Sequence, residues 1–196
     1  MKMEKEISVL VTTDYNSLDK ILLNNGFNIK EKYLVSDVYM INENLNLKKL
    51  SNLEILSNTV IVRYIENIVK ELLYKYKKYD EDGSIIEQGK VCCPVLNIEQ
   101  AILFMESIHY KKLFNIMDKC IVYANDDIDL IVQIVNDKYI MIEMEDKQEF
   151  SGKKYEDISI MKKDLLKYNL PIDTSNFFVK KAEIVLKEEL KNRWKR

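Results

Sequence analysis

The chain has 196 residues, 47% hydrophobic and 32% charged, a balance typical of a soluble globular protein long enough to bury a core. Its 30 basic and 32 acidic residues give a formal charge of −2, so no global positive field favours nucleic acid, and an anion site would have to be built locally. Cys92, Cys93 and Cys120 form an odd set without disulfide spacing. With no apolar run that fits a signal peptide or a membrane span, we expect a cytoplasmic protein.

The start of the chain predicts a strand, a helix and a second strand. The first strand begins at "EKEIS" and continues through residue 13, and the helix over 17–25 can be capped by Asp14 or Asn16 and stopped by Gly26. The second strand is expected at 32–41. The polar, leucine-bearing stretch at 42–58 is either a loop or a short helix.

Two strands rich in β-branched and aromatic residues are predicted next, at 59–67 and 70–79, followed by a turn at Asp82-Gly83. Strand, helix and strand then recur, with an offset of about 84 residues that matches Tyr39 with Tyr123. Further strands are expected at 90–96, 114–125, 128–135 and 138–146, with a helix at 98–108 capped by Asn97 and a hairpin turn at Asn136-Asp137.

The tail predicts two helices, at 159–169 and 176–196, the second with Phe178, Ala182, Val185 and Leu186 on one side. These elements predict an α+β protein. We expect an eight-stranded antiparallel sheet closed into a β-barrel, with flanking helices and a C-terminal helical segment. Residues 1–196 are expected to form a single domain.

Two acidic pairs lie on predicted strands, because side chains two apart share a face. Glu4 and Glu6 form one pair, and Glu143 and Glu145 form the other. Clustered carboxylates are costly unless a cation neutralises them, and hard divalent ions favour oxygen ligands. The pairs therefore indicate either a divalent metal site or the solvated face of an antiparallel sheet.

Three cations on neighbouring strands are suited to phosphate oxygens. On one predicted strand, alternation places the Arg63 side chain on the face opposite that of its apolar neighbours. On the next strand, Lys75 and Lys77 share a face. Arginine can bind phosphate in bidentate fashion, and lysine acts as a point charge. A site with both the acidic pairs and these cations would hold a metal and a polyphosphate.

The motifs "EKEIS", "SDVY", "VIVRY", "LLYKY" and "IEMED", in this order, resemble those of the triphosphate tunnel enzymes, the CYTH superfamily. This family includes class IV adenylate cyclases, thiamine triphosphatases and inorganic triphosphatases, and the resemblance covers about residues 3 to 190. It implies a barrel with a charged tunnel that binds a triphosphate with Mg²⁺ or Mn²⁺. By match, Glu4, Glu6, Glu143 and Glu145 would bind the metal, and Arg63 and Lys75, with Lys77 beside them, would bind the substrate.

Several positions depart from the family pattern. Ser8 replaces the lysine of E-x-E-x-K, and further departures are at Ile61, Cys92, Cys120 and Gln133. Each lost charge-assisted contact would cost about 1.5–3 kcal/mol of binding energy.

Three hypotheses follow. The first is a metal-dependent triphosphatase or cyclase whose catalytic residues the sequence does not identify. The second is a tunnel protein that binds an anionic or nucleotide-like ligand without turnover, and the third is a partner-binding domain without a small-molecule site. For the first two we expect a triphosphate or nucleotide as partner and neither a membrane nor nucleic acid, and a homodimer is compatible with the sequence.

Overall fold

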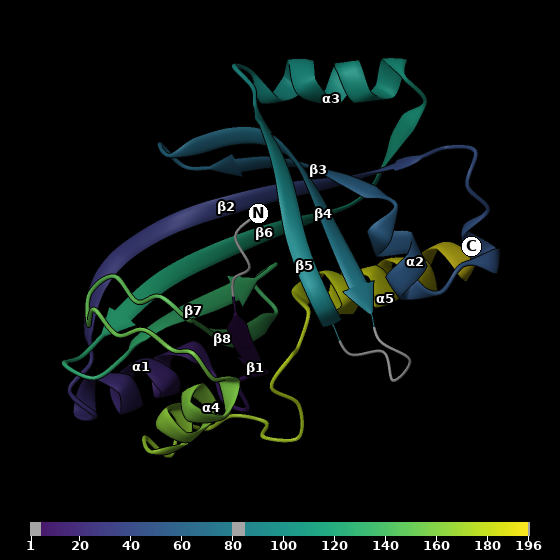
Figure 1. Ribbon diagram of the computed structural model, residues 1–196. Coiled ribbons are helices and arrows are strands. Elements are labelled where there is room, and N and C mark those ends of the chain that lie inside the picture. Colours follow the sequence, from purple (N-terminus) through teal and green to yellow (C-terminus); the bar gives the residue numbers. More distant parts are fainter. Residues whose placement is uncertain (1–4, 80–84, 196) are drawn as a thin grey trace. The chain divides into compact units, whose positions relative to one another are not determined.

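A computed structural model describes residues 5–79 and 85–195, so the turn predicted at Asp82-Gly83 lies outside the described residues. The strands are β1 (Glu6–Leu10), β2 (Asn28–Asn42), β3 (Thr59–Ile65), β4 (Val69–Tyr79), β5 (Ile85–Pro94), β6 (Tyr110–Ala124), β7 (Asp129–Val135) and β8 (Tyr139–Glu145). The helices are α1 (Tyr15–Asn24), η1 (Leu47–Lys49, a 3-10 turn), α2 (Asn52–Ser57), α3 (Ile98–Ser107), α4 (Ile158–Leu166) and α5 (Lys181–Trp194), labelled with the strands in Figure 1.

The strands pair in the order β1-β8-β7-β6-β2-β3-β4-β5. The predicted α+β class, with an eight-stranded antiparallel sheet and flanking helices, is confirmed. Among the described residues β1 and β5 end this order, and the closed barrel stays a prediction. No helix in the described part of the chain is both long and apolar enough to cross a bilayer.

Contacts divide the chain into two compact units. Of the described residues, unit 1 contains 35–79, 85–117 and 181–195, and unit 2 contains 5–34 and 118–180. Strands β2 and β6 contribute residues to both units. The single domain expected over residues 1–196 stays a prediction.

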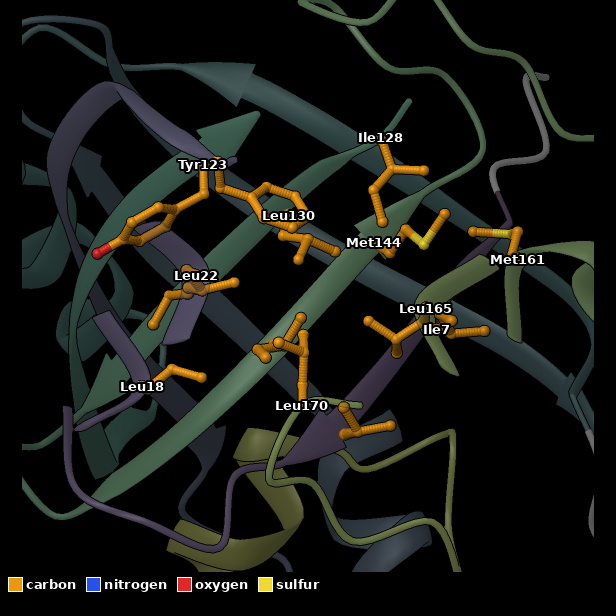
Figure 2. Close-up of a cluster of buried hydrophobic side chains, with 14 of the residues drawn as sticks. Ile7, Leu18, Leu22, Tyr123, Ile128, Leu130, Met144, Met161, Leu165 and Leu170 are labelled. Carbon is orange, nitrogen blue, oxygen red and sulfur yellow. The ribbon is translucent and has the colours of Figure 1, made fainter. Parts of the chain in front are cut away.

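The core of unit 2 lies between one face of its strands and helices α1 and α4. Figure 2 shows Ile7 of β1 and Met144 of β8 together with Leu22 of α1 and Leu165 of α4. All four side chains are almost fully buried. Burying one such side chain contributes roughly 1.5–3 kcal/mol, so this face of β1 and β8 must point inward. The alternation of a strand then turns the intervening acidic residues to the opposite face.

The core of unit 1 is built on the same plan. Met40 of β2 and Val62 of β3 pack against Ala101 and Met105 of α3. Helices α2 and α5 also lie side by side in this unit (Figure 1). Because Met40 and Val62 occupy the helix-covered face, the residues next to them on each strand point to the other face.

Helix caps explain where the short helices begin. The stretch at 42–58, for which the sequence left loop or helix open, contains η1 and α2, and Ser51 and Glu54 cap α2 reciprocally. Asp14, rather than Asn16, caps α1 by accepting from the backbone N–H of Ser17.

The helix predicted over 176–196 is wrong in its first part. The helix begins only at Lys181, and Phe178 is 48% exposed. Residues 177–179 instead run beside β1: the Ser8 N–H donates to Phe177 O at 2.9 Å, and the Val179 N–H donates to Ser8 O at 3.0 Å. An uncovered strand edge leaves backbone donors and acceptors unpaired, and this segment satisfies those of Ser8.

Candidate functional site

The two predicted acidic pairs meet on neighbouring strands of unit 2. Strands β1 and β8 pair so that Glu6 lies opposite Glu145 and Ser8 lies opposite Glu143. Directly opposed residues share a face, with Cβ atoms roughly 5 Å apart. Glu4 lies outside the described residues. Glu6, Glu143 and Glu145, which belong to two separate acidic pairs in the sequence, therefore share one face of unit 2.

These carboxylates share a face without converging on one point. Among the described residues, no three histidine, cysteine or acidic side chains form a group that could hold a metal ion. Glu6 and Glu145 are exposed, and Glu143 is half-buried. The Glu143 carboxylate accepts a hydrogen bond of 3.1 Å from the side-chain amide of Gln133. A metal role for the glutamates stays a prediction, for which the oxygen donors are chemically suitable.

Tyr33 is a member of this acidic face that the sequence analysis did not select. Burial raises the pKa of its phenol well above the usual value, and the nearby Cys120, Glu143 and Glu145 raise it further. Tyr33 therefore stays protonated and can serve as a hydrogen-bond donor. Strand alternation places Tyr33 on the same side of β2 as Asp37, which is the signal that could have identified it.

The predicted substrate-binding arginine of unit 1 is already paired. Arg63 donates from Nε to Asp37 Oδ1 at 2.8 Å and from Nη2 to Asp37 Oδ2 at 2.7 Å. Burial acts to lower the pKa of Arg63, but the hydrogen bonds and charge of Asp37 outweigh it, and the pKa lies above its usual value. Two donors of the guanidinium are therefore used within the protein, and a ligand would have to approach the remaining side.

Lys75 in β4 lies directly opposite Lys90 in β5. Lys77 lies opposite Gln88, but its side chain is outside the described part of the protein. Like charges on directly opposed residues are unfavourable unless anions offset them. The pairing of Lys75 with Lys90 thus concentrates positive charge in unit 1, where the sequence predicted phosphate binding.

Cys92 lies near the cations of unit 1. Burial raises the pKa of its thiol, and the charge and hydrogen bonding of Glu71 raise it further. Nucleophilic cysteines work as thiolates, so a raised pKa argues against a catalytic role for Cys92, which is exposed.

The other departures from the family pattern are neutral and buried. Ile61 and Cys120 are each 2% exposed, and Cys120 lies opposite Gln133. Neither position contributes charge to the face that carries the predicted site.

No family model and no curated protein matches the sequence. Solved structures do resemble it. PH1819 of Pyrococcus horikoshii OT3 is 14% identical, with a TM-score of 0.62 over 94% of this chain and 99% of that protein. A proposed adenylate cyclase of Vibrio parahaemolyticus is 10% identical, with a TM-score of 0.57 over 97% of this chain and 98% of that one.

A third similar structure is HpAC1 of Hippeastrum, a proposed adenylyl cyclase described as having a dominant triphosphatase activity. It is 12% identical to this chain, with a TM-score of 0.58 over 95% of this chain and 96% of HpAC1. Identities this low show a shared fold. The chain therefore shares its fold with these structures, two of which are described as adenylate or adenylyl cyclases. At the level of the fold this agrees with the resemblance predicted from the sequence.

Proposed function

We propose that this protein binds a triphosphate-bearing small molecule together with Mg²⁺ or Mn²⁺ inside a barrel tunnel, and hydrolyses or cyclises it. The observation that carries the proposal is the pairing of β1 with β8, which sets Glu6 opposite Glu145 and Glu143 opposite Ser8 on one face. A divalent cation would offset the repulsion among the several carboxylates of this face, and carboxylate oxygens are ligands that such a cation prefers. The activity attributed to HpAC1 supports the choice of triphosphate chemistry.

The anion would be bound by the cations of unit 1. Lys75 and Lys90 face one another across β4 and β5, and Arg63 lies on the neighbouring strand β3. Asp37 holds Arg63 in a defined position, which reduces the entropy that the arginine would lose on binding a phosphate. Bound Mg²⁺ or Mn²⁺ would supply Lewis acidity toward the phosphoryl oxygens.

A second function, ligand binding without turnover, is favoured by two observations. The Arg63 guanidinium is shared with Asp37, which weakens its charge toward a phosphate. Ser8 replaces the lysine that the family motif places on the acidic face. A protein with these changes could retain affinity for a triphosphate while losing the groups that accelerate its reaction.

The experiment is a titration of the full-length protein with tripolyphosphate and with ATP, each with and without Mn²⁺. Thermal unfolding reports binding, and released phosphate, pyrophosphate or cyclic nucleotide reports turnover. Metal-dependent stabilisation with product supports the enzyme, and stabilisation without product supports the binder. Absence of stabilisation by either anion would contradict both.

A matched pair of variants tests the acidic face. Glu143→Gln should abolish the metal-dependent part of the stabilisation, because it removes a carboxylate from that face. Glu149→Gln, at an exposed position after β8, is the control and should leave the stabilisation unchanged. Equal behaviour of the two variants would argue against a metal role for Glu143.

A further inference from the structure

Three charged side chains lie in one row across β2, β3 and β4 of unit 1. Asp37 lies directly opposite Arg63, and Arg63 lies directly opposite Glu71. Directly opposed residues share a face, with Cβ atoms roughly 5 Å apart. Two carboxylates therefore flank one guanidinium, and the row as a whole has a net negative charge.

The guanidinium of Arg63 is bound mainly by one of the two carboxylates. Asp37 accepts from Nε and Nη2 of Arg63 at 2.8 and 2.7 Å. On its other side Glu71 lies opposite Pro94 of β5, which has no charge. The Cys92 thiol hydrogen-bonds with Glu71, but a protonated thiol does not neutralise a carboxylate. Glu71 thus places a negative charge beside the arginine that the sequence assigned to the substrate.

Glu71 is close enough to Arg63 to act on it electrostatically. Burial acts to lower the pKa of Arg63, whereas the negative charges of Asp37 and Glu71 raise it. Glu71 is half-buried, so solvent and salt screen its charge less than that of a surface residue. A phosphate that reached Arg63 would therefore be attracted by the guanidinium and repelled by the carboxylate of Glu71.

The lysines of unit 1 lie apart from this row. Lys75 follows Glu71 by four residues on the same face of β4, about 13 Å along the strand. Leu73 lies between them on that face and is fully buried, and Ile61 directly opposite it is 2% exposed. A buried apolar row thus separates the positive pair of Lys75 and Lys90 from the acidic surroundings of Arg63.

We propose that Glu71 is a specificity-determining residue of the unit 1 anion site, which repels highly charged phosphate chains from Arg63 and confines them to Lys75 and Lys90. This inference rests on the proposed function and deepens it, because it names the residue that limits which anions the site accepts. A carboxylate at this place is a repulsive element, and specificity commonly depends on such elements as well as on attractive contacts.

The test is calorimetric titration of the full-length protein with tripolyphosphate and, separately, with inorganic phosphate, at one salt and one Mn²⁺ concentration. Glu71→Gln should tighten tripolyphosphate binding by about tenfold or more, because it removes a like charge from the path of the anion. It should tighten phosphate binding by less, since a single phosphate can bind at Lys75 and Lys90 without reaching Arg63. Glu71→Asp, which keeps the charge, should bind tripolyphosphate nearly as the wild type does.

Glu106→Gln is the matched control, because it makes the same change in net charge at an exposed position in α3 of unit 1. It should leave the affinity for both anions unchanged. Tripolyphosphate binding that is unchanged or weaker in Glu71→Gln would overturn the proposal. So would an equal gain in Glu106→Gln, or an equal gain for phosphate and tripolyphosphate in Glu71→Gln. A gain in affinity cannot result from misfolding, so the expected result is not open to that explanation.

The outcomes separate this inference from the proposed function. If the wild type and Glu71→Gln bind tripolyphosphate equally well, the function stands and the role of Glu71 fails. If Glu71→Gln binds tripolyphosphate while the wild type binds neither tripolyphosphate nor ATP, the role of Glu71 stands and the function fails. If neither protein binds either anion, both are overturned.

Discussion

Arg63 and Asp37 face one another on adjacent strands and form a bidentate ion pair, with donor–acceptor distances of 2.8 and 2.7 Å. The Asp37 side chain is 1% exposed and that of Arg63 is 18% exposed. Burying a charge is costly unless it is paired, so the two residues depend on one another. The ion pair fixes the position of the Arg63 guanidinium, and it also uses the Nε and Nη2 donors that a ligand would otherwise bind.

Asp37→Asn should destabilise the protein by about 3 kcal/mol, because it leaves the Arg63 charge largely buried without its counter-ion. Urea unfolding measures the loss. The control is Lys119→Ala, which breaks the exposed pair with Asp137 and should cost less than about 1 kcal/mol. Equal losses in the two variants would show that the Arg63–Asp37 pair contributes no more than a surface pair.

Asp164 connects α4 to the segment that follows β8. Its carboxylate accepts from Lys153 Nζ at 2.5 Å, from the Tyr155 hydroxyl at 2.9 Å, and from Lys167 Nζ at 2.6 Å. Burial alone would raise the pKa of Asp164, but the hydrogen bonds from Lys153, Lys167 and Tyr155 outweigh it and lower the pKa from 3.8 to about 2. A pKa lower in the folded than in the unfolded protein means that the ionised carboxylate stabilises the fold.

We therefore expect Asp164 to contribute about 2 kcal/mol that is fully present above pH 4 and lost as the pH falls toward 2. Asp164→Asn should remove this contribution at pH 7 and flatten the fall in stability between pH 4 and pH 2. Urea unfolding across this range measures both effects. Asp126→Asn, at an exposed position, is the control. If Asp164→Asn kept the full loss of stability between pH 4 and pH 2, that loss would not come from Asp164.

Tyr123 and Tyr39, which the repeat in the sequence equates, have different surroundings. Tyr123 lies in the core of unit 2, and its ring is drawn in Figure 2. Its hydroxyl donates to Asp19 Oδ1 in α1 at 2.5 Å, and the Tyr15 hydroxyl lies 2.9 Å from it. Tyr39 instead stacks on Phe114, with ring centroids 4.3 Å apart. The two halves related by the offset of 84 residues therefore share the order of their elements, but tyrosines at matching positions have different partners.

Tyr123→Phe should cost about 1–2 kcal/mol, because it keeps the buried ring and removes the hydroxyl that binds Asp19. Thermal unfolding reports the loss. Tyr64→Phe, at a half-buried position in β3, is the matched control and should change stability by less. If Asp19→Asn in the Tyr123→Phe background cost as much as it does in the wild type, Tyr123 and Asp19 would be energetically independent.

The order of strands and helices was predictable because it depends on local alternation and capping. Strand β8, for example, alternates Ile142 and Met144 with Glu143 and Glu145, and burial of the first two determines where the acids point. The meeting of Glu6 with Glu145 was also predicted, through the family resemblance. What decided it physically was the antiparallel pairing of β1 with β8, which unites distant parts of the sequence.

The partners of the predicted residues could not be derived in the same way. The pairing of Arg63 with Asp37 depends on the register of β2 against β3, and the alternation within one strand does not say which residue of the neighbouring strand lies opposite. The roles of Tyr33 and Gln133 likewise depend on neighbours from other strands. The segment around Phe178 was assigned to the helix because Phe177 and Phe178 continue the amphipathic pattern of the residues that follow. The same apolar residues also suit an extended segment beside β1, which is what the structure has.

Lys75 and Lys90, which face one another across β4 and β5, give the last prediction. If they bind the triphosphate, Lys75→Ala and Lys90→Ala should each weaken tripolyphosphate binding by about tenfold or more, since a charge-assisted contact is worth about 1.5–3 kcal/mol. Lys112→Ala, at an exposed position in β6, is the charge-matched control. Raising the salt concentration should weaken the wild type more than either variant, because the variants have one fewer charge to screen. If the affinity fell equally in all three variants, the loss would reflect only the change in net charge. Lys75 and Lys90 would then not be specific triphosphate ligands.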